Sequence, residues 1–99
     1  MAIYKNIGSA TTTPLITKGR GKGAISKITI ANHHDSLSNT INLYLYDDTP
    51  SAEQTYVITE TTIPPRATLA LDDNLSYNSS VYHLKITTSS AATTTIIIK

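Results

Sequence analysis

Apolar and polar residues alternate with a period of two in short runs along most of the chain. That period places successive side chains on opposite faces of a strand, so each run predicts a strand with one buried face. No run of ten residues has the i, i+3, i+4, i+7 spacing of an amphipathic helix. The alternation predicts eight strands, at residues 3–7, 12–17, 24–32, 40–47, 55–63, 67–71, 81–88 and 93–99.

Turn-forming residues separate these runs. Pro64 and Pro65 cannot continue a central ladder, and the stretch 72–80, DDNLSYNSS, is rich in turn formers. Short strands at this spacing are typical of antiparallel sandwiches. The sequence therefore predicts an all-β chain, a single-domain β-sandwich over residues 1–99. We expect a jelly-roll or immunoglobulin-like arrangement of about eight short, mainly antiparallel strands.

The run TINLYLYD at 40–47 shows how the alternation assigns faces. Ile41, Leu43 and Leu45 are predicted to face the core, which leaves Tyr44 and Tyr46 on the opposite face. Tyrosine is enriched at protein interfaces and also serves as a flat stacking surface for sugars or bases. We expect Tyr44 and Tyr46 to form a contact surface. Basic residues do not alternate with them in this run, which argues against nucleic acid as the ligand.

The last run, TTTIIIK, is apolar at Ile96, Ile97 and Ile98 without alternation. Such a strand is either covered on both faces or is an exposed edge that awaits a partner chain. We count these three isoleucines as candidate contact residues.

The composition supports a β chain and limits the chemistry. Thr and Ile are the commonest residues, and Tyr is present without Phe or Trp; Thr, Ile and Tyr all suit a pleated, half-buried surface. The chain has no cysteine, which excludes disulfides and thiolate chemistry and fits synthesis in a reducing cytoplasm. No apolar stretch approaches the length that spans a bilayer, and the start lacks a signal-peptide pattern. A net charge of +1 argues against a protein that coats nucleic acid.

The charges are unevenly distributed along the chain, because five cations precede the first acid, Asp35. A surface with separate cationic and anionic parts is attracted to copies of itself. The alternative is that neighbouring strands mix the charges in space.

The stretch TKGRGKGA at 17–24 combines three glycines with the cations Lys18, Arg20 and Lys22. A phosphate-binding P-loop needs a longer glycine spacing and a following helix, whereas a strand follows here. A dinucleotide fingerprint fails for the same reason. We expect a strand connection in which Lys18, Arg20 and Lys22 either contact an acidic neighbouring subunit or are solvated.

Two histidines and a carboxylate lie together in NHHD at 32–35. Adjacent residues of a strand point to opposite faces, so a structural turn explains them better than a metal site. The chain contains no G-x-S-x-G nucleophile elbow, and no spacing supports an acid/base pair. We expect no catalytic residue, no cofactor and no metal, and hence no enzyme.

Four segments carry a resemblance to a known group of proteins: GKGAISKITIAN (21–32), INLYLYD (41–47), YVITETTIPPRATLAL (56–71) and YHLKITTSSAATTTIIIK (82–99). In this order of strands and turns the chain resembles small bacteriophage virion structural proteins of the β-sandwich capsid decoration (cement) or tail-accessory type. One departure is LSYNSS at 75–80, where such sequences often have a turn with Asp.

The resemblance implies a non-enzymatic virion protein, made in the host cytoplasm and located on the capsid surface. It would stabilise the head by binding the major capsid protein or other virion subunits. We expect a homo-oligomer, with a trimer favoured, and neither a membrane nor nucleic acid as a direct partner. The alternative is a tail, baseplate or fibre-associated component that binds a host polysaccharide through Tyr44, Tyr46 and loop carboxylates.

Overall fold

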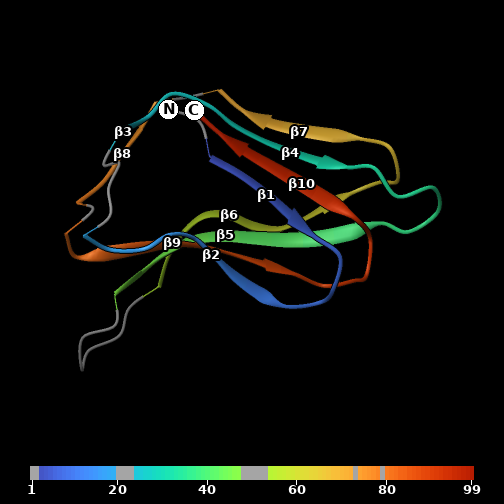
Figure 1. Cartoon of the computed structure of the whole chain (residues 1–99), viewed down its shortest axis with the longest axis horizontal. Coiled ribbons are helices and arrows are strands. Elements are labelled where there is room, and N and C mark those ends of the chain that lie inside the picture. The colour runs from blue at the N-terminus through green and yellow to red at the C-terminus, as the bar shows by residue number, and fades with distance from the viewer. Residues whose placement is uncertain (1–2, 20–23, 48–53, 73, 79) are drawn as a thin grey trace.

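The computed structural model describes residues 3–19, 24–47, 54–72, 74–78 and 80–99. These residues form antiparallel strands in two facing layers, seen as an upper and a lower group in Figure 1. The strands are β1 (Ile3–Ile7), β2 (Thr12–Ile16), β3 (Ala24–Ile25), β4 (Ile28–Asn32), β5 (Asn39–Asp47), β6 (Gln54–Ile63), β7 (Thr68–Leu71), β8 (Leu75–Ser76), β9 (Tyr82–Thr88) and β10 (Thr94–Ile98). No helix in these segments is long and apolar enough to cross a membrane.

The strand order identifies the type of sandwich. One sheet has the order β1-β10-β4-β7 and the other β2-β9-β5-β6, while β3 and β8 pair with each other. The first and last strands are therefore neighbours, and the chain changes sheet at most connections. This is the double Greek key of a jelly roll, whereas an immunoglobulin sandwich keeps its first two strands in one sheet. Of the two arrangements expected from the sequence, the jelly roll is the one present.

The core lies between the two sheets, as the alternation predicted. In β5, Ile41 and Leu43 are fully buried, and Leu45 is nearly so. The same inward face is supplied by the other central strands, whose buried residues are Ile28, Ile30, Leu84, Ile86, Ile96 and Ile98. Burial of such side chains contributes about 1.5–3 kcal/mol each to folding, which explains why the period-two pattern determines the layers.

The predicted strand 24–32 is divided into β3 and β4 by Ser26 and Lys27. Both backbone N–H groups donate to the carbonyl of Lys99, at 2.8 and 3.3 Å. β3 then pairs with β8, which lies inside the stretch predicted as a turn. The prediction of one continuous strand and of a strand-free turn was wrong here. The short β3–β8 pair depends on segments 50 residues apart in sequence, which no local pattern encodes.

The connection between β6 and β7 follows the proline prediction. β6 ends at Ile63, and the Ala67 N–H donates to the Pro64 carbonyl over 3.1 Å. Arg66 has a φ of 63°, which turns the chain into the other sheet, and its guanidinium bonds Asp35 at 3.0 Å. This connection lies at the same end of the sandwich as the β4–β5 and β9–β10 connections (Figure 1).

β10 is a central strand, not an edge. It lies between β1 and β4, so Ile96 and Ile98 face the core and are fully buried. The expectation that these two isoleucines form an exposed contact is wrong, because a central strand presents its inward side chains to the opposite sheet. Ile97 points outward and is half-buried. It remains a candidate contact residue.

Candidate interaction surfaces

The outer face of the β2-β9-β5-β6 sheet gathers the aromatic side chains. Antiparallel register places Tyr44 of β5 between Tyr56 of β6 and Lys85 of β9. One step along, Tyr46 lies between Gln54 and His83. Because directly opposed residues share a face, these side chains form one surface. We call it the tyrosine face, defined by Tyr44, Tyr46, Tyr56 and Lys85.

Tyr44 lies on the predicted face but is only 6% exposed. The Tyr56 ring covers it, with centroids 5.5 Å apart and planes tilted by 39°. The Thr87 hydroxyl donates to the Tyr44 hydroxyl at 3.5 Å from the neighbouring strand. The expectation that Tyr44 is an exposed contact is therefore wrong. β5 is a central strand, and long side chains on both neighbours close over its middle.

Tyr46 is half-buried, and its ring already has a partner. The ammonium of Lys85 lies 4.3 Å from the ring centroid, a cation–π distance, and the His83 ring is 6.3 Å away. A basic residue does therefore accompany the tyrosines, contrary to the sequence-based expectation. It comes from β9, some 40 residues away, so the run 40–47 could not reveal it. The role of Tyr46 as a contact remains a prediction.

Tyr56 is the accessible ring of the tyrosine face, with 48% of its surface exposed. Its hydroxyl donates to Oε1 of Gln54 at 2.8 Å, a bond between two residues of one edge strand. Sequence reasoning did not select Tyr56, since it lies at the start of a predicted strand without a clear face. Its spacing of two from Gln54 is the only local signal that could have suggested it.

The outer face of the β1-β10-β4-β7 sheet has a different character. Register aligns two rows across all four strands, Tyr4–Ile97–Thr29–Ala70 and Asn6–Thr95–Ala31–Thr68. Neither row contains a charged residue. Tyr4 is 66% exposed, and Ile97 lies next to it in the same row. We call these eight residues the neutral face.

The glycine-rich connection after β2 is described only in part. The Lys18 N–H donates to Nδ1 of His83 at 3.2 Å, which ties the start of the connection to β9. Lys18 is half-buried. Arg20 and Lys22 lie outside the described residues, so their expected contact role stays a prediction.

The stretch 32–35 forms a hydrogen-bonded turn. Nδ1 of His34 accepts from the N–H groups of Ser36 and Leu37, both at 3.1 Å, and Nε2 of His33 lies 3.1 Å from the Thr95 hydroxyl. The Asn32 amide donates to the carbonyls of Leu37 and Ile63. In the segments that the structure describes, no group of three or more His, Cys, Asp or Glu side chains could hold a metal ion.

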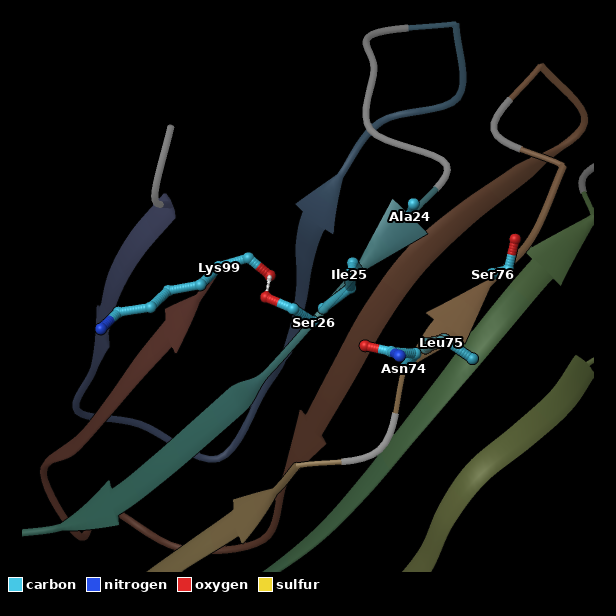
Figure 2. Close-up of a pocket in the computed structure, with 7 residues that line it drawn as sticks. All are labelled: Ala24, Ile25, Ser26, Asn74, Leu75, Ser76 and Lys99. Atoms are coloured by element: carbon cyan, nitrogen blue, oxygen red, sulfur yellow. Dashed lines mark hydrogen bonds between the residues drawn. The ribbon is translucent and has the colours of Figure 1, made fainter.

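A cavity of about 220 Å³ lies beside the β3–β8 pair. Its walls are formed mainly by β3, β8 and the residues next to them, and the Lys99 ammonium points away from these strands (Figure 2). The Ser26 hydroxyl donates to the Lys99 carbonyl at 3.1 Å. The lining of the cavity is therefore mostly apolar, with serine hydroxyl groups in it. It contains no pair of side chains suited to acid/base catalysis.

Tyr77, directly after β8, has a buried hydroxyl that finds no hydrogen-bond partner among the residues that the structure describes. Burial raises the pKa of this phenol, because the charged phenolate loses more solvation than the neutral form.

Two layers with jelly-roll order define this chain as an antiparallel β-sandwich protein. No family model matches the sequence, and no curated protein matches it. The chain aligns over 99% of its length with the structure of infectious bursal disease virus Gx strain, at a TM-score of 0.50, 10% identity and 29% of that chain.

A second alignment covers 99% of the chain and 24% of the Clostridium thermocellum endo-1,4-β-D-xylanase 10B CBM22-1-GH10 modules, complexed with xylohexaose, at a TM-score of 0.50 and 12% identity. The Yersinia pseudotuberculosis-derived mitogen aligns at a TM-score of 0.43 and 15% identity, over 99% of this chain and 80% of that one. The chain thus covers under a third of the length of the infectious bursal disease virus chain and of the xylanase chain. At these identities the similarity shows the fold alone.

Proposed function

We propose that the chain is a non-enzymatic structural protein of a bacteriophage virion that decorates the capsid by binding the major capsid protein. The observation that carries the proposal is the neutral face, with two uncharged rows of mostly small residues across four strands. The cores of protein interfaces are depleted in charge and enriched in tyrosine. The exposed Tyr4 and the half-buried Ile97 supply the large apolar groups of this face.

The architecture supports the same proposal. Jelly rolls recur in viral capsid domains and in lectins, and the chain aligns with part of the infectious bursal disease virus structure. The segments on which the resemblance to phage virion proteins rests include β4, β5, β6, β7, β9 and β10. In this proposal the protein stabilises the capsid by adding contact area between subunits, and it catalyses no reaction.

The small area of the neutral face argues that several copies of the chain bind together. Four strands about 4.8 Å apart and about five residues long give a face of roughly 300 Å². A stable contact buries about 800 Å² on each partner. One neutral face with its neighbouring loops would bind weakly, whereas a cyclic oligomer gains avidity by engaging several capsid subunits at once. The proposal therefore includes self-association, with a trimer favoured, and a location on the virion.

Co-sedimentation with capsids of the encoding phage, assembled without this chain, tests the proposal. We expect the wild-type chain to sediment with capsids and raise their resistance to heat. Ile97→Lys places a charge in the middle of the neutral face and should abolish binding, while circular dichroism stays that of the wild type. Tyr56→Ala, on the opposite face, is the matched control and should bind normally.

Two outcomes would contradict the proposal. Absence of the chain from capsids but presence on tails would assign it to the tail-accessory alternative. Normal capsid binding by Ile97→Lys would show that the neutral face is not the capsid contact.

A further inference from the structure

Large apolar side chains of the described segments are strongly exposed at three separate places, Tyr4, Leu37 and Tyr56. Tyr56 differs from the other two because neighbouring side chains hold its ring. We propose that Tyr56, with Gln54 and Asn42, forms a binding site for a neutral pyranose saccharide. The site lies on the opposite side of the sandwich from the neutral face, so the inference goes beyond the proposed capsid contact and does not depend on it.

The ring of Tyr56 is prepared for stacking. One side packs against Tyr44, and the hydroxyl is tied to Gln54, yet 48% of the residue remains exposed. A ring fixed in this way loses little conformational freedom when a ligand covers it. The axial C–H groups of a pyranose with equatorial hydroxyls form an apolar surface that fits a flat aromatic ring.

Amide donors flank the ring along the sheet. The Oε1 of Gln54 accepts from Tyr56, which leaves its amide nitrogen for a ligand. Asn42 lies two residues from Tyr44 on the same face, and its Oδ1 accepts from the Glu60 N–H at 2.8 Å. That bond fixes the orientation of the Asn42 amide, whose nitrogen is likewise left as a donor. Gln54 is opposite Tyr46, and Asn42 is four residues from Tyr46 in β5, so the two amides lie about 14 Å apart along the strands with the Tyr44–Tyr56 pair between them. They therefore flank a saccharide that stacks on Tyr56.

The character of the site favours a neutral sugar over a polyanion. A nucleic-acid strand needs a basic groove beside several stacking rings. Here Lys85, the cation of the tyrosine face, is engaged with Tyr46 at 4.3 Å, and Tyr44 is only 6% exposed. One accessible ring with amide and hydroxyl neighbours matches the hydroxyls and C–H face of an uncharged sugar.

The site also fits a sugar better than a second protein. Tyr56 is the one strongly exposed aromatic ring of the tyrosine face. A single ring buries far less than the roughly 800 Å² per partner of a stable protein interface.

Titration of the ¹⁵N-labelled chain with four neutral hexasaccharides, cellohexaose, xylohexaose, mannohexaose and chitohexaose, tests the inference by NMR. We expect at least one to shift the resonances of Tyr56, Gln54 and Asn42 with saturable binding. Tyr56→Ala should weaken that binding at least tenfold. Tyr56→Phe keeps the ring and should weaken it no more than about threefold. Tyr4→Ala, a more exposed tyrosine on the other sheet, should leave it unchanged.

The inference is overturned if none of the four sugars shifts these resonances, or if the shifts persist in Tyr56→Ala. Should Tyr56→Ala fail to fold, Gln54→Ala replaces it, with at least a threefold loss expected and an unchanged affinity as the contrary result. Loss of capsid co-sedimentation in Tyr56→Ala, with no sugar bound by the wild type, would make the ring part of a protein interface. Because Ile97→Lys tests capsid binding separately, failure of one proposal is distinguishable from failure of the other.

Discussion

The side chain of Asn39 donates from Nδ2 to the hydroxyl of Thr94 over 2.8 Å, and both residues are fully buried. This bond joins β5 of one sheet to β10 of the other. The Asn39 Oδ1 accepts from the Ser89 N–H, and the Thr94 hydroxyl donates to the Ala92 carbonyl. A polar bridge thus crosses an apolar core with its polar groups satisfied, and it fixes how the sheets meet at the end where β9 turns into β10.

Asn39→Ala should lower the free energy of unfolding by about 1–3 kcal/mol, because it removes the buried hydrogen bond to the Thr94 hydroxyl, whereas the Ser89 N–H still donates to the Thr40 carbonyl. Urea denaturation measures the loss. A double-mutant cycle with Thr94→Val should give a coupling energy of about 1 kcal/mol or more. The matched control is Thr40→Ala, which removes the exposed hydroxyl pair with Thr62 at 2.8 Å and should cost less than about 1 kcal/mol. Equal losses at Asn39 and Thr40 would contradict a special role for the bridge.

Neighbouring isoleucines of β10 should respond very differently to truncation. Ile96→Ala should cost about 2–5 kcal/mol, because the side chain is fully buried and its loss leaves a cavity. Ile97→Ala, at a half-buried outward position, should cost less than about 1.5 kcal/mol. Denaturant midpoints of the two variants check this difference. Comparable losses would mean that β10 does not lie between β1 and β4 with Ile96 inward.

Tyr77→Phe removes a buried hydroxyl without a partner, so the variant should be as stable as the wild type or more stable by up to about 1 kcal/mol. The wild type should also lose stability as pH rises above about 10. The unfolded phenol ionises near pH 10, whereas burial raises the pKa of Tyr77 in the folded chain, so its contribution is present below pH 10 and lost above it.

Ultraviolet titration of the six tyrosines measures the same effect. Tyr77→Phe should remove a transition that lies above the ordinary range, and its stability should fall less steeply at alkaline pH. A Tyr77→Phe variant that is much less stable than the wild type would show that the hydroxyl has a partner.

Glu60 has a φ of 41°, in the left-handed region that side chains disfavour, at a bulge where β5 and β6 change register. Glu60→Gly should therefore be neutral or stabilising by up to about 1 kcal/mol, since relief of strain offsets the added backbone freedom of glycine. Thr59→Gly, the adjacent position with ordinary backbone, should cost about 1 kcal/mol. Thermal unfolding of both variants measures the contrast, and a destabilised Glu60→Gly would argue against strain at this bulge.

The sequence alone was sufficient for the all-β class and for the inward face of most strands. Ile41, Leu43 and Leu45 are buried as their alternation predicts, because the side chains of a strand alternate between its faces. The prolines at 64 and 65 likewise marked the end of β6, since proline lacks the N–H that a ladder needs. These properties are local, so a linear pattern expresses them.

The candidate surfaces were less predictable, because exposure of an outward side chain depends on the neighbouring strands. Tyr44 and Tyr56 both point outward, yet one is 6% and the other 48% exposed, since Tyr44 is in a central strand and Tyr56 in an edge strand. For the same reason Ile96 is buried, because its strand β10 is central and is not an exposed edge. Strand order is set by long-range pairing, and it alone determined which tyrosine ring is exposed and which isoleucine faces outward. Local residue patterns therefore determined the strands and their inner face, while the order of those strands in the two sheets determined the surfaces.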